Sequence, residues 1–183
     1  MLVFLDFEAS SLGKRSYPIE VGWVFEDGRS QSYLIRPAET WTDWDVEAEA
    51  IHGIARSELV AKGVAHDEVA RQMVEDLSGH DLAASAPSWD GKWLSTLLRA
   101  AGLPRHSLRL RDSDDVLSES ALTILAPVIG SDRLEQVVAD VLASTDVHAP
   151  DWKPAHRALA DAEEERSRWI AVKAAAQRIA AAA

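Results

Sequence analysis

Apolar runs near the start of the chain predict three β-strands. Residues 2–7 begin as a wholly apolar run, which is typical of a central strand. Residues 19–25 and 31–35 are the next two candidates, and Asp27-Gly28 between them is a hairpin-turn signal. Pro37 ends the third run. We therefore expect the chain to open with an antiparallel meander of three strands.

The later pattern alternates between helical periodicity and short strands. Residues 37–54 show no regular pattern. Helical spacing of apolar positions, together with short buried runs, then predicts these elements: helices at 57–62, 65–77, 90–101, 118–128, 133–143 and 154–180, and strands at 81–86 and 108–110. This order predicts an α/β fold, in which a central mixed five-stranded sheet, beginning with three antiparallel strands, is flanked by helices.

Length and composition fit one globular domain over residues 1–183. The chain is 47% hydrophobic, enough for a real core, and we expect its Ala-rich end, residues 179–183, to fray. It has no cysteine, which excludes disulfides and thiolate metal sites and suits a reducing, cytoplasmic location. We expect no secretory leader and no membrane span, because no apolar run is long enough.

The net charge of −11 bears on partners. Proteins that bind nucleic acid broadly usually present a basic surface, so this charge argues against that class. Two bound divalent cations would add about four positive charges at the place where a phosphate must sit. A nucleic-acid enzyme of this composition should have a small footprint on its substrate, strong metal dependence and little non-specific affinity.

Three acidic residues in the first half of the chain are candidates for metal chemistry. Asp6 and Glu8 are two apart on a predicted strand, so both side chains point to one face. Hard cations such as Mg²⁺ and Mn²⁺ prefer such oxygen ligands, although the strand could simply end in solvent. Asp90 opens a predicted helix after a small-residue strand, and a helix-capping role alone would explain it.

A second signature, His156-x₄-Asp161, lies near the end of the chain. Two residues five apart on a helix differ by about 140° around its axis, so they cannot both face one site from mid-helix. Pro154 predicts a helix start at 154 or 155, which leaves His156 in the first turn or the preceding loop. From there it could swing toward Asp161 and act as a general base. Alternatively, it is a surface histidine beside the acidic run 161–165.

The order and spacing of these motifs resemble the DEDDh branch of the DnaQ-like exonucleases, whose fold is ribonuclease H-like. The resemblance covers residues 2–169, and the segments 19–22 (Ile-Glu-Val-Gly) and 51–54 (Ile-His-Gly-Ile) support it. The chain departs from the family where Ala9-Ser10 replaces the usual Thr-Thr or Thr-Ser, where Ser85-Ala86 replaces His-Asn, and where Trp89 replaces Phe. These departures affect substrate contacts and leave every metal ligand in place.

The resemblance implies a two-metal site and a 3′–5′ polarity. Two divalent cations, Mg²⁺ or Mn²⁺, would be held by Asp6, Glu8, Asp90 and Asp161, and His156 would deprotonate the attacking water. The 3′-oxygen of the next nucleotide would leave, so that nucleoside 5′-monophosphates are released. The resemblance further implies substrate contacts from Phe7, Ala9, Ser10 and His52, and places Glu20 as an acid behind the metals. His52 could instead pack in the core, and Glu20 could be an exposed strand residue.

The sequence therefore predicts a metal-dependent 3′–5′ exonuclease acting on single-stranded DNA or RNA 3′ ends or on short oligonucleotides. One alternative is a catalytically silent nucleic-acid-binding or scaffold domain of the same fold. Another is a proofreading subunit in a polymerase complex. The long C-terminal helix could build a homodimer. Three tryptophans could stack bases or instead pack in the core or at its rim: Trp41, Trp44 and Trp152.

Overall fold

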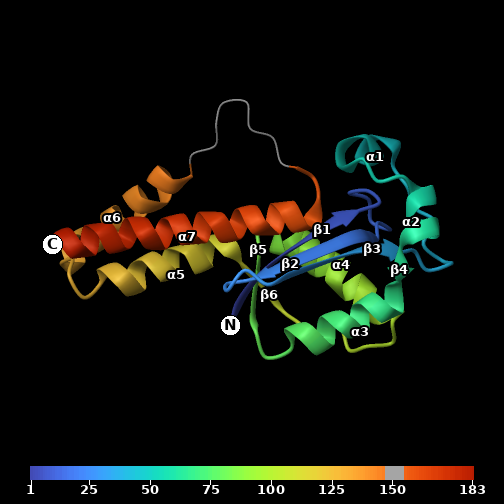
Figure 1. Ribbon diagram of the computed structural model, residues 1–183, viewed down its shortest axis with the longest axis horizontal. Helices are drawn as coiled ribbons and strands as arrows, with labels where there is room; N and C mark the ends of the chain where they lie inside the picture. Colours follow the sequence, from blue (N-terminus) through green and yellow to red (C-terminus); the bar gives the residue numbers. More distant parts are fainter. Residues whose placement is uncertain (147–154) are drawn as a thin grey trace.

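The computed structural model describes residues 1–146 and 155–183 of the chain. Its described part contains a mixed sheet of six strands in the spatial order β4-β3-β2-β1-β5-β6 (Figure 1). The strands are β1 (Leu2–Ala9), β2 (Pro18–Phe25), β3 (Ser30–Arg36), β4 (Val64–Ala65), β5 (Asp81–Ala84) and β6 (Leu110–Asp112). The first three are antiparallel, as expected, whereas β5 runs parallel to β1 and β6 runs parallel to β5.

The described sheet has one strand more than the five that the sequence predicted. The additional strand, β4, has two residues and pairs in parallel with Ile35 and Arg36 at the end of β3. Two residues are too few to show an alternating pattern, and the predicted helix 65–77 had absorbed one of them. β6 lies at Leu110–Asp112 rather than at 108–110, because its three residues are all only partly buried and give no sharp apolar signal.

Seven helices surround the sheet in the described residues, and several boundaries differ from the predicted ones. They are α1 (Val46–His52), α2 (Arg56–Lys62), α3 (His66–Leu77), α4 (Pro87–Ala100), α5 (Ser113–Leu125), α6 (Ser131–Thr145) and α7 (Ala158–Ala182). The sequence missed α1 because six of its seven residues are at least partly exposed, which removes the apolar periodicity. α5 begins at Ser113 rather than 118, since the Asp112 side chain caps it by accepting from the Asp114 N–H group.

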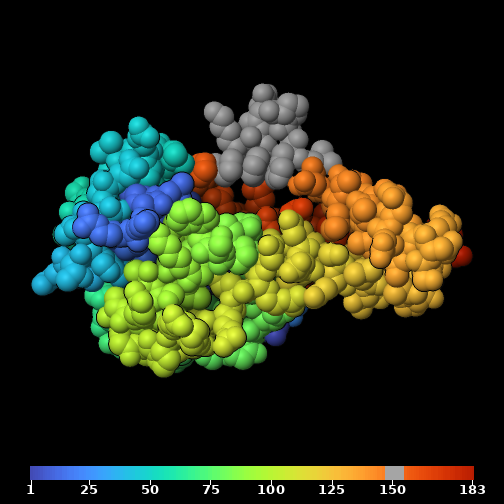
Figure 2. All heavy atoms as spheres, turned by 180° about the vertical axis from the view of Figure 1, so that it is seen from behind, coloured from blue at the N-terminus to red at the C-terminus, as the bar shows by residue number. Residues whose placement is uncertain are grey.

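Both faces of β1 are buried, which explains its apolar start. Val3 and Leu5 point into a cluster formed with α3 and α4, whereas Phe4 points into a second cluster formed with α5, α6 and α7. In Figure 1 the helices α5, α6 and α7 extend away from the sheet, while α1 and α2 lie at the other end. Seen from behind, the green to lime segment that contains α4 lies over the sheet, whereas the yellow and orange helices α5 and α6 lie at the other end (Figure 2).

The long C-terminal helix crosses the sheet and continues into the helical end. Trp169 of α7 packs against Phe4 of β1, with ring centroids 6.0 Å apart. The helix continues to Ala182, where fraying from residue 179 was expected, because Ile179 and Ala180 pack against the second cluster. None of the helices in residues 1–146 and 155–183 combines the length and apolar character that a membrane-spanning segment needs.

Candidate active site

The last residues of β1 carry two carboxylates on the sheet face that α7 covers. Asp6 lies opposite Gly22 of β2, and Glu8 lies opposite Glu20. The register of the β1–β2 ladder shifts between Glu8 and Ala9, and Ala9 is the last residue of the strand. Asp6 and Glu8 therefore project together from the end of a buried strand, as their spacing predicts.

Asp90 contributes a third carboxylate from the first turn of α4. This helix begins at Pro87 rather than at Asp90, since proline is well suited to the first helical position. Asp90 is only 1% exposed, and its Oδ2 atom has no hydrogen-bond partner among the described residues. An ionised carboxylate is costly in such a place unless a cation or a donor compensates it. Its burial goes beyond what a helix-capping role needs.

His156 and Asp161 meet the β1 carboxylates from the start of α7. The helix begins at Ala158 rather than at 154 or 155, and Pro154 lies outside the described residues. His156 thus precedes the helix, with a left-handed φ of 49°. Ligand atoms of Glu8, His156 and Asp161 all lie within 4.8 Å of one another. The 140° separation expected on a helix does not apply, because the backbone turns before the helix starts.

Burial raises the pKa values of all four carboxyl groups, and neighbouring carboxylates add to the rise at Asp6 and Glu8. Burial is the largest cause for Asp6, whose pKa lies well above its usual value, and the charges of Asp90, Glu8 and Asp161 add to it. Burial, followed by the charge of Asp161, raises the pKa of Glu8 to about 8. Burial raises the pKa of Asp90 to about 7 and also raises that of Asp161. The charge of Arg157 acts in the opposite direction at Glu8, whose pKa nevertheless stays raised.

These groups fit divalent cations. Their donor atoms are carboxylate oxygens, which suit Mg²⁺ or Mn²⁺, and one imidazole nitrogen, which also suits Zn²⁺. The unpartnered Asp90 Oδ2 is a ready ligand atom. A bound cation would also reverse the upward pKa shifts, since it favours the ionised carboxylates. The residues present therefore fit a divalent metal centre.

A mainly apolar cavity of about 210 Å³ adjoins the cluster. α1 supplies one wall and the loop after β1 supplies another, so that exposed Leu12 and Ile51 flank it. The lining residues come from four segments: Glu8, Ala9, Ser11, Leu12, Ala48, Ile51, His52, Trp93 and His156. Ala48 and Ile51 were not predicted as site residues, because α1 was not predicted and Ile51 was noted only as part of the Ile-His-Gly-Ile segment.

The four residues expected to contact substrate occupy different places. Ala9 and His52 line the cavity. His52 is buried, its Nδ1 accepts from the Ile54 N–H group at 3.0 Å, and burial lowers its pKa. Phe7 packs in the core, and the buried Ser10 hydroxyl accepts from the Tyr17 N–H group at 3.1 Å. The side chains of Phe7 and Ser10 do not line the cavity.

The remaining predicted residues have structural partners. Glu20 is buried beside Glu8 and binds Arg157, which sequence reasoning did not single out. Trp41 stacks on Tyr17 with ring centroids 5.1 Å apart, and the Trp44 Nε1–H group donates to Glu49. Packing thus accounts for both tryptophans, while Trp152 lies outside the described residues.

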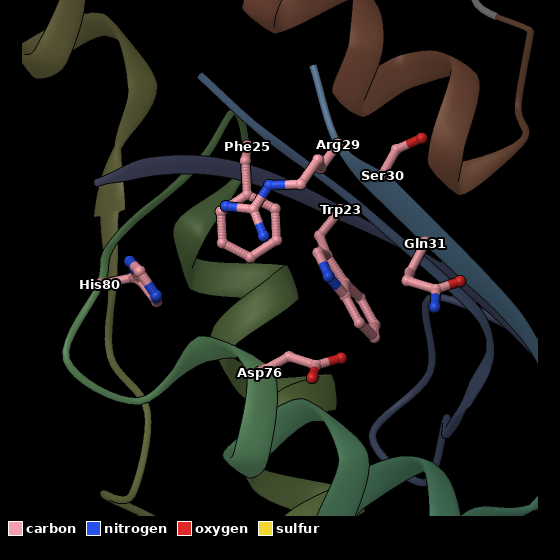
Figure 3. Close-up of a pocket in the computed structure, with 7 residues that line it drawn as sticks. All are labelled: Trp23, Phe25, Arg29, Ser30, Gln31, Asp76 and His80. Carbon is pink, nitrogen blue, oxygen red and sulfur yellow. The ribbon is translucent and has the colours of Figure 1, made fainter. Parts of the chain in front are cut away.

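A larger cavity, of about 430 Å³, lies at the opposite end of β2 (Figure 3). In the close-up, Arg29 lies over the Phe25 ring, with its guanidinium carbon 4.6 Å from the ring centroid. Residues of β2, the β2–β3 turn, β3, α3 and the loop before β5 line this cavity: Trp23, Phe25, Arg29, Ser30, Gln31, Asp76 and His80. It contains none of the predicted site residues, so the volume of a cavity does not locate the chemistry here.

Comparison with known proteins identifies the fold. Neither protein-family models nor curated protein sequences gave a match. Among solved structures, a zinc-bound complex of E. coli exonuclease I with single-stranded DNA is 16% identical, with a TM-score of 0.66 over 94% of this chain and 40% of that one. E. coli exonuclease I with a dA16 oligonucleotide is 17% identical, with a TM-score of 0.68 over 99% of this chain and 42% of that one.

A thermophilic relative gives the same result. Exonuclease I from Methylocaldum szegediense is 18% identical, with a TM-score of 0.63 over 92% of this chain and 40% of that one. The chain thus spans about two fifths of the length of these structures. At such low identity the similarity establishes the fold alone, and it confirms the expected α/β, ribonuclease H-like class.

Proposed function

We propose that this chain is a metal-dependent 3′–5′ exonuclease that removes nucleoside 5′-monophosphates from single-stranded DNA or RNA. The observation that carries the proposal is the convergence of four carboxyl groups and one histidine, from three distant segments, at the end of β1. The similarity to exonuclease I structures, some of them complexes with single-stranded DNA, supports the same substrate class.

The carboxylate side chains would bind metal, and the histidine side chain would transfer a proton. Asp6, Glu8, Asp90 and Asp161 would hold two cations, which supply Lewis acidity to the scissile phosphate and the attacking water. An imidazole nitrogen of His156 would accept the proton from that water. The 3′-oxygen of the penultimate nucleotide then leaves with the shortened strand. No side chain has to act as a nucleophile.

The apolar cavity beside the carboxylates would receive the terminal nucleoside. Leu12 and Ile51 offer exposed apolar contacts at its rim, and His52 and Trp93 form part of its lining. Apolar and aromatic contacts to a base are tolerant of sequence, since every base has a π-face. This arrangement favours a nuclease that removes any terminal nucleotide. Discrimination between RNA and DNA would depend on contacts to the 2′-hydroxyl.

The catalytically silent alternative predicts binding without cleavage. Against it, all five predicted catalytic positions hold residue types that the chemistry needs. The proofreading alternative would require a polymerase partner, which co-purification would reveal. A polymerase partner, a homodimer and a cytoplasmic location stay predictions.

End-labelled oligonucleotides test the proposal. Single-stranded DNA and RNA carrying a 5′ label should yield a ladder of shortened labelled strands in Mn²⁺ or Mg²⁺ and no change in chelator. A 3′ label should appear at once as a mononucleotide. His156→Ala should slow the reaction by about 10²–10⁴-fold, the usual contribution of a general base. Mn²⁺-induced thermal stabilisation without any cleavage would instead support the silent alternative.

A further inference from the structure

The start of α7 is capped by a side chain from a distant strand. Arg157, at the N-cap position, makes no capping bond with its own side chain. Instead, the Ala158 N–H group donates to Glu20 Oε2 at 3.0 Å, across 138 positions of sequence. A carboxylate at a helix N-terminus satisfies a free donor and interacts favourably with the helix dipole. Glu20 thus fixes where α7 begins.

Arg157 binds the same carboxylate through a fork. Its Nε atom lies 3.2 Å and 3.1 Å from the two oxygens of Glu20, and its Nη2 atom lies 2.6 Å from Oε1. The Glu20 side chain is 5% exposed, whereas that of Arg157 is 53% exposed. This bidentate geometry fixes direction as well as distance, which a single ion pair does not.

These contacts bracket His156. On its C-terminal side, Arg157 and the Ala158 amide are both bound to Glu20. On its N-terminal side, the Ala155 N–H group donates to Asp161 Oδ1 at 3.2 Å. His156 itself has a left-handed φ of 49°, which a non-glycine residue keeps only when its surroundings fix it. The residues on both sides supply that constraint.

We propose that Glu20 and Arg157 form a clamp that positions His156 as the base; this proposal rests on the proposed function. Both are positioning residues, because they act through the backbone at His156. Glu20 lies opposite Glu8 in the β1–β2 ladder. The clamp therefore also sets the position of the histidine relative to the strand that carries two of the proposed metal ligands. It thus keeps His156 at a fixed position relative to the carboxylates of β1.

The test is kinetic, with Arg157→Gln as the main variant, because the exposed side chain can be replaced without unfolding the protein. We expect kcat to fall by about ten- to hundred-fold, as for a displacement of a catalytic group by about 1 Å. KM and Mn²⁺-induced stabilisation should be retained. Arg157→Lys keeps the charge but loses the fork, so it should be impaired as well. Glu20→Gln should show the same loss of kcat with retained KM.

Arg166→Gln is the matched control. Arg166 also lies on α7 and also ties it to the sheet, since its Nε and Nη2 atoms donate to the Glu26 carbonyl at 3.2 Å and 2.9 Å. Its loss should lower the melting temperature without changing kcat. Full activity of Arg157→Lys would overturn the clamp, because charge alone would then suffice. A raised KM with unchanged kcat in Arg157→Gln would also overturn it, because Arg157 would then contact substrate.

A readout on the protein alone separates this proposal from the proposed function. Hydrogen exchange at the Ala158 amide should be faster in Arg157→Gln than in wild type, and the His156 imidazole resonance should shift. Both changes without any wild-type hydrolysis would refute the exonuclease and leave the clamp intact. Unchanged exchange and an unchanged resonance would refute the clamp, whatever the activity of the wild type.

Discussion

The burial and the raised pKa of Asp90 could not be predicted from its sequence context. An aspartate in the first turn of a helix is common, and dipole and capping effects explain it. In the structure it is buried against the end of β1, next to carboxylates from distant parts of the chain. Only the folded chain creates the burial that raises its pKa to about 7. This environment is typical of a metal ligand rather than a cap.

The raised pKa values predict how stability changes with pH. Glu8 and Asp90 have folded-state pKa values of about 8 and about 7, above those of the unfolded chain, so the native state binds more protons between about pH 4 and 8. Stability of the metal-free protein should therefore fall as pH rises through this window. The melting temperature should be higher near pH 5.5 than at pH 8. Mn²⁺ should restore more stability at pH 8, because ligands must be deprotonated to bind it.

Asp90→Asn is the matched variant for this measurement. A neutral amide removes one ionisation from the cluster, so the metal-free variant should be more stable than wild type at pH 8. A gain of about 1 kcal/mol would appear as a melting temperature about 2–4 °C higher. Mn²⁺ should stabilise it much less than wild type. A flat pH profile in metal-free wild type would show that the pKa values of these carboxyl groups are not raised in solution.

Spacing predicted which charged residues the fold brings together, whereas the sequence contained no signal for residues that act only through a contact formed on folding. Asp6 and Glu8 share a strand face, and a histidine ahead of a helix can meet an aspartate within it. Arg157 has no comparable signal, because its role exists only once Glu20 lies beneath it. The burial of Ser10 and Phe7 was likewise not deducible from their motif position.

At the scale of elements, the apolar pattern predicted the buried helices and strands best, and the two elements that it missed have little or no pattern. β1, β2, α3 and α4 each bury a face, and each was found near its observed place. α1 is largely exposed and β4 has two residues, so neither has a pattern to detect. Several boundaries moved by a few residues, because caps such as Asp112 decide helix starts locally.

The contact between α7 and β2 predicts the effect of one methyl group. A Cβ atom on Gly22 would lie 2.3 Å from the Leu159 backbone nitrogen and 2.6 Å from the Ala158 carbonyl carbon. Gly22→Ala must push the start of α7 away from Asp6, which faces Gly22 across the ladder. We expect lower stability, by about 1–3 kcal/mol for overpacking, together with loss of Mn²⁺-induced stabilisation in thermal unfolding.

Gly91→Ala is the control for that substitution. Gly91 lies within α4, and a Cβ there meets no atom within 4 Å. Alanine in a helix is favoured over glycine by about 0.5–1 kcal/mol, so this variant should be slightly more stable and should retain Mn²⁺ binding. Equal behaviour of the two variants would contradict the close approach at Gly22.

At the scale of the whole molecule, the net charge of −11 limits how nucleic acid can be held. Without metal, the protein should repel a polyanion and show no binding to single-stranded DNA at physiological salt. With Mn²⁺, the slowly cleaving His156→Ala should bind it, and log K should fall with log salt with a slope of magnitude about 1–2, as expected for two or three phosphate contacts on a single strand. Fluorescence anisotropy of a labelled oligonucleotide measures binding with and without Mn²⁺. Tight binding in chelator would contradict a metal-bridged, small footprint.

The central claim is that the buried carboxylates at the end of β1 make this chain a nuclease through bound metal. The most direct measurement is the hydrolysis of a 5′-labelled single-stranded oligonucleotide by wild type and Asp90→Asn, side by side in Mn²⁺. We predict stepwise shortening from the 3′ end by wild type and a loss of at least about 10²-fold in the variant, as for removal of a preorganised electrostatic group. Equal rates for the two proteins, or no hydrolysis by wild type, would contradict the account.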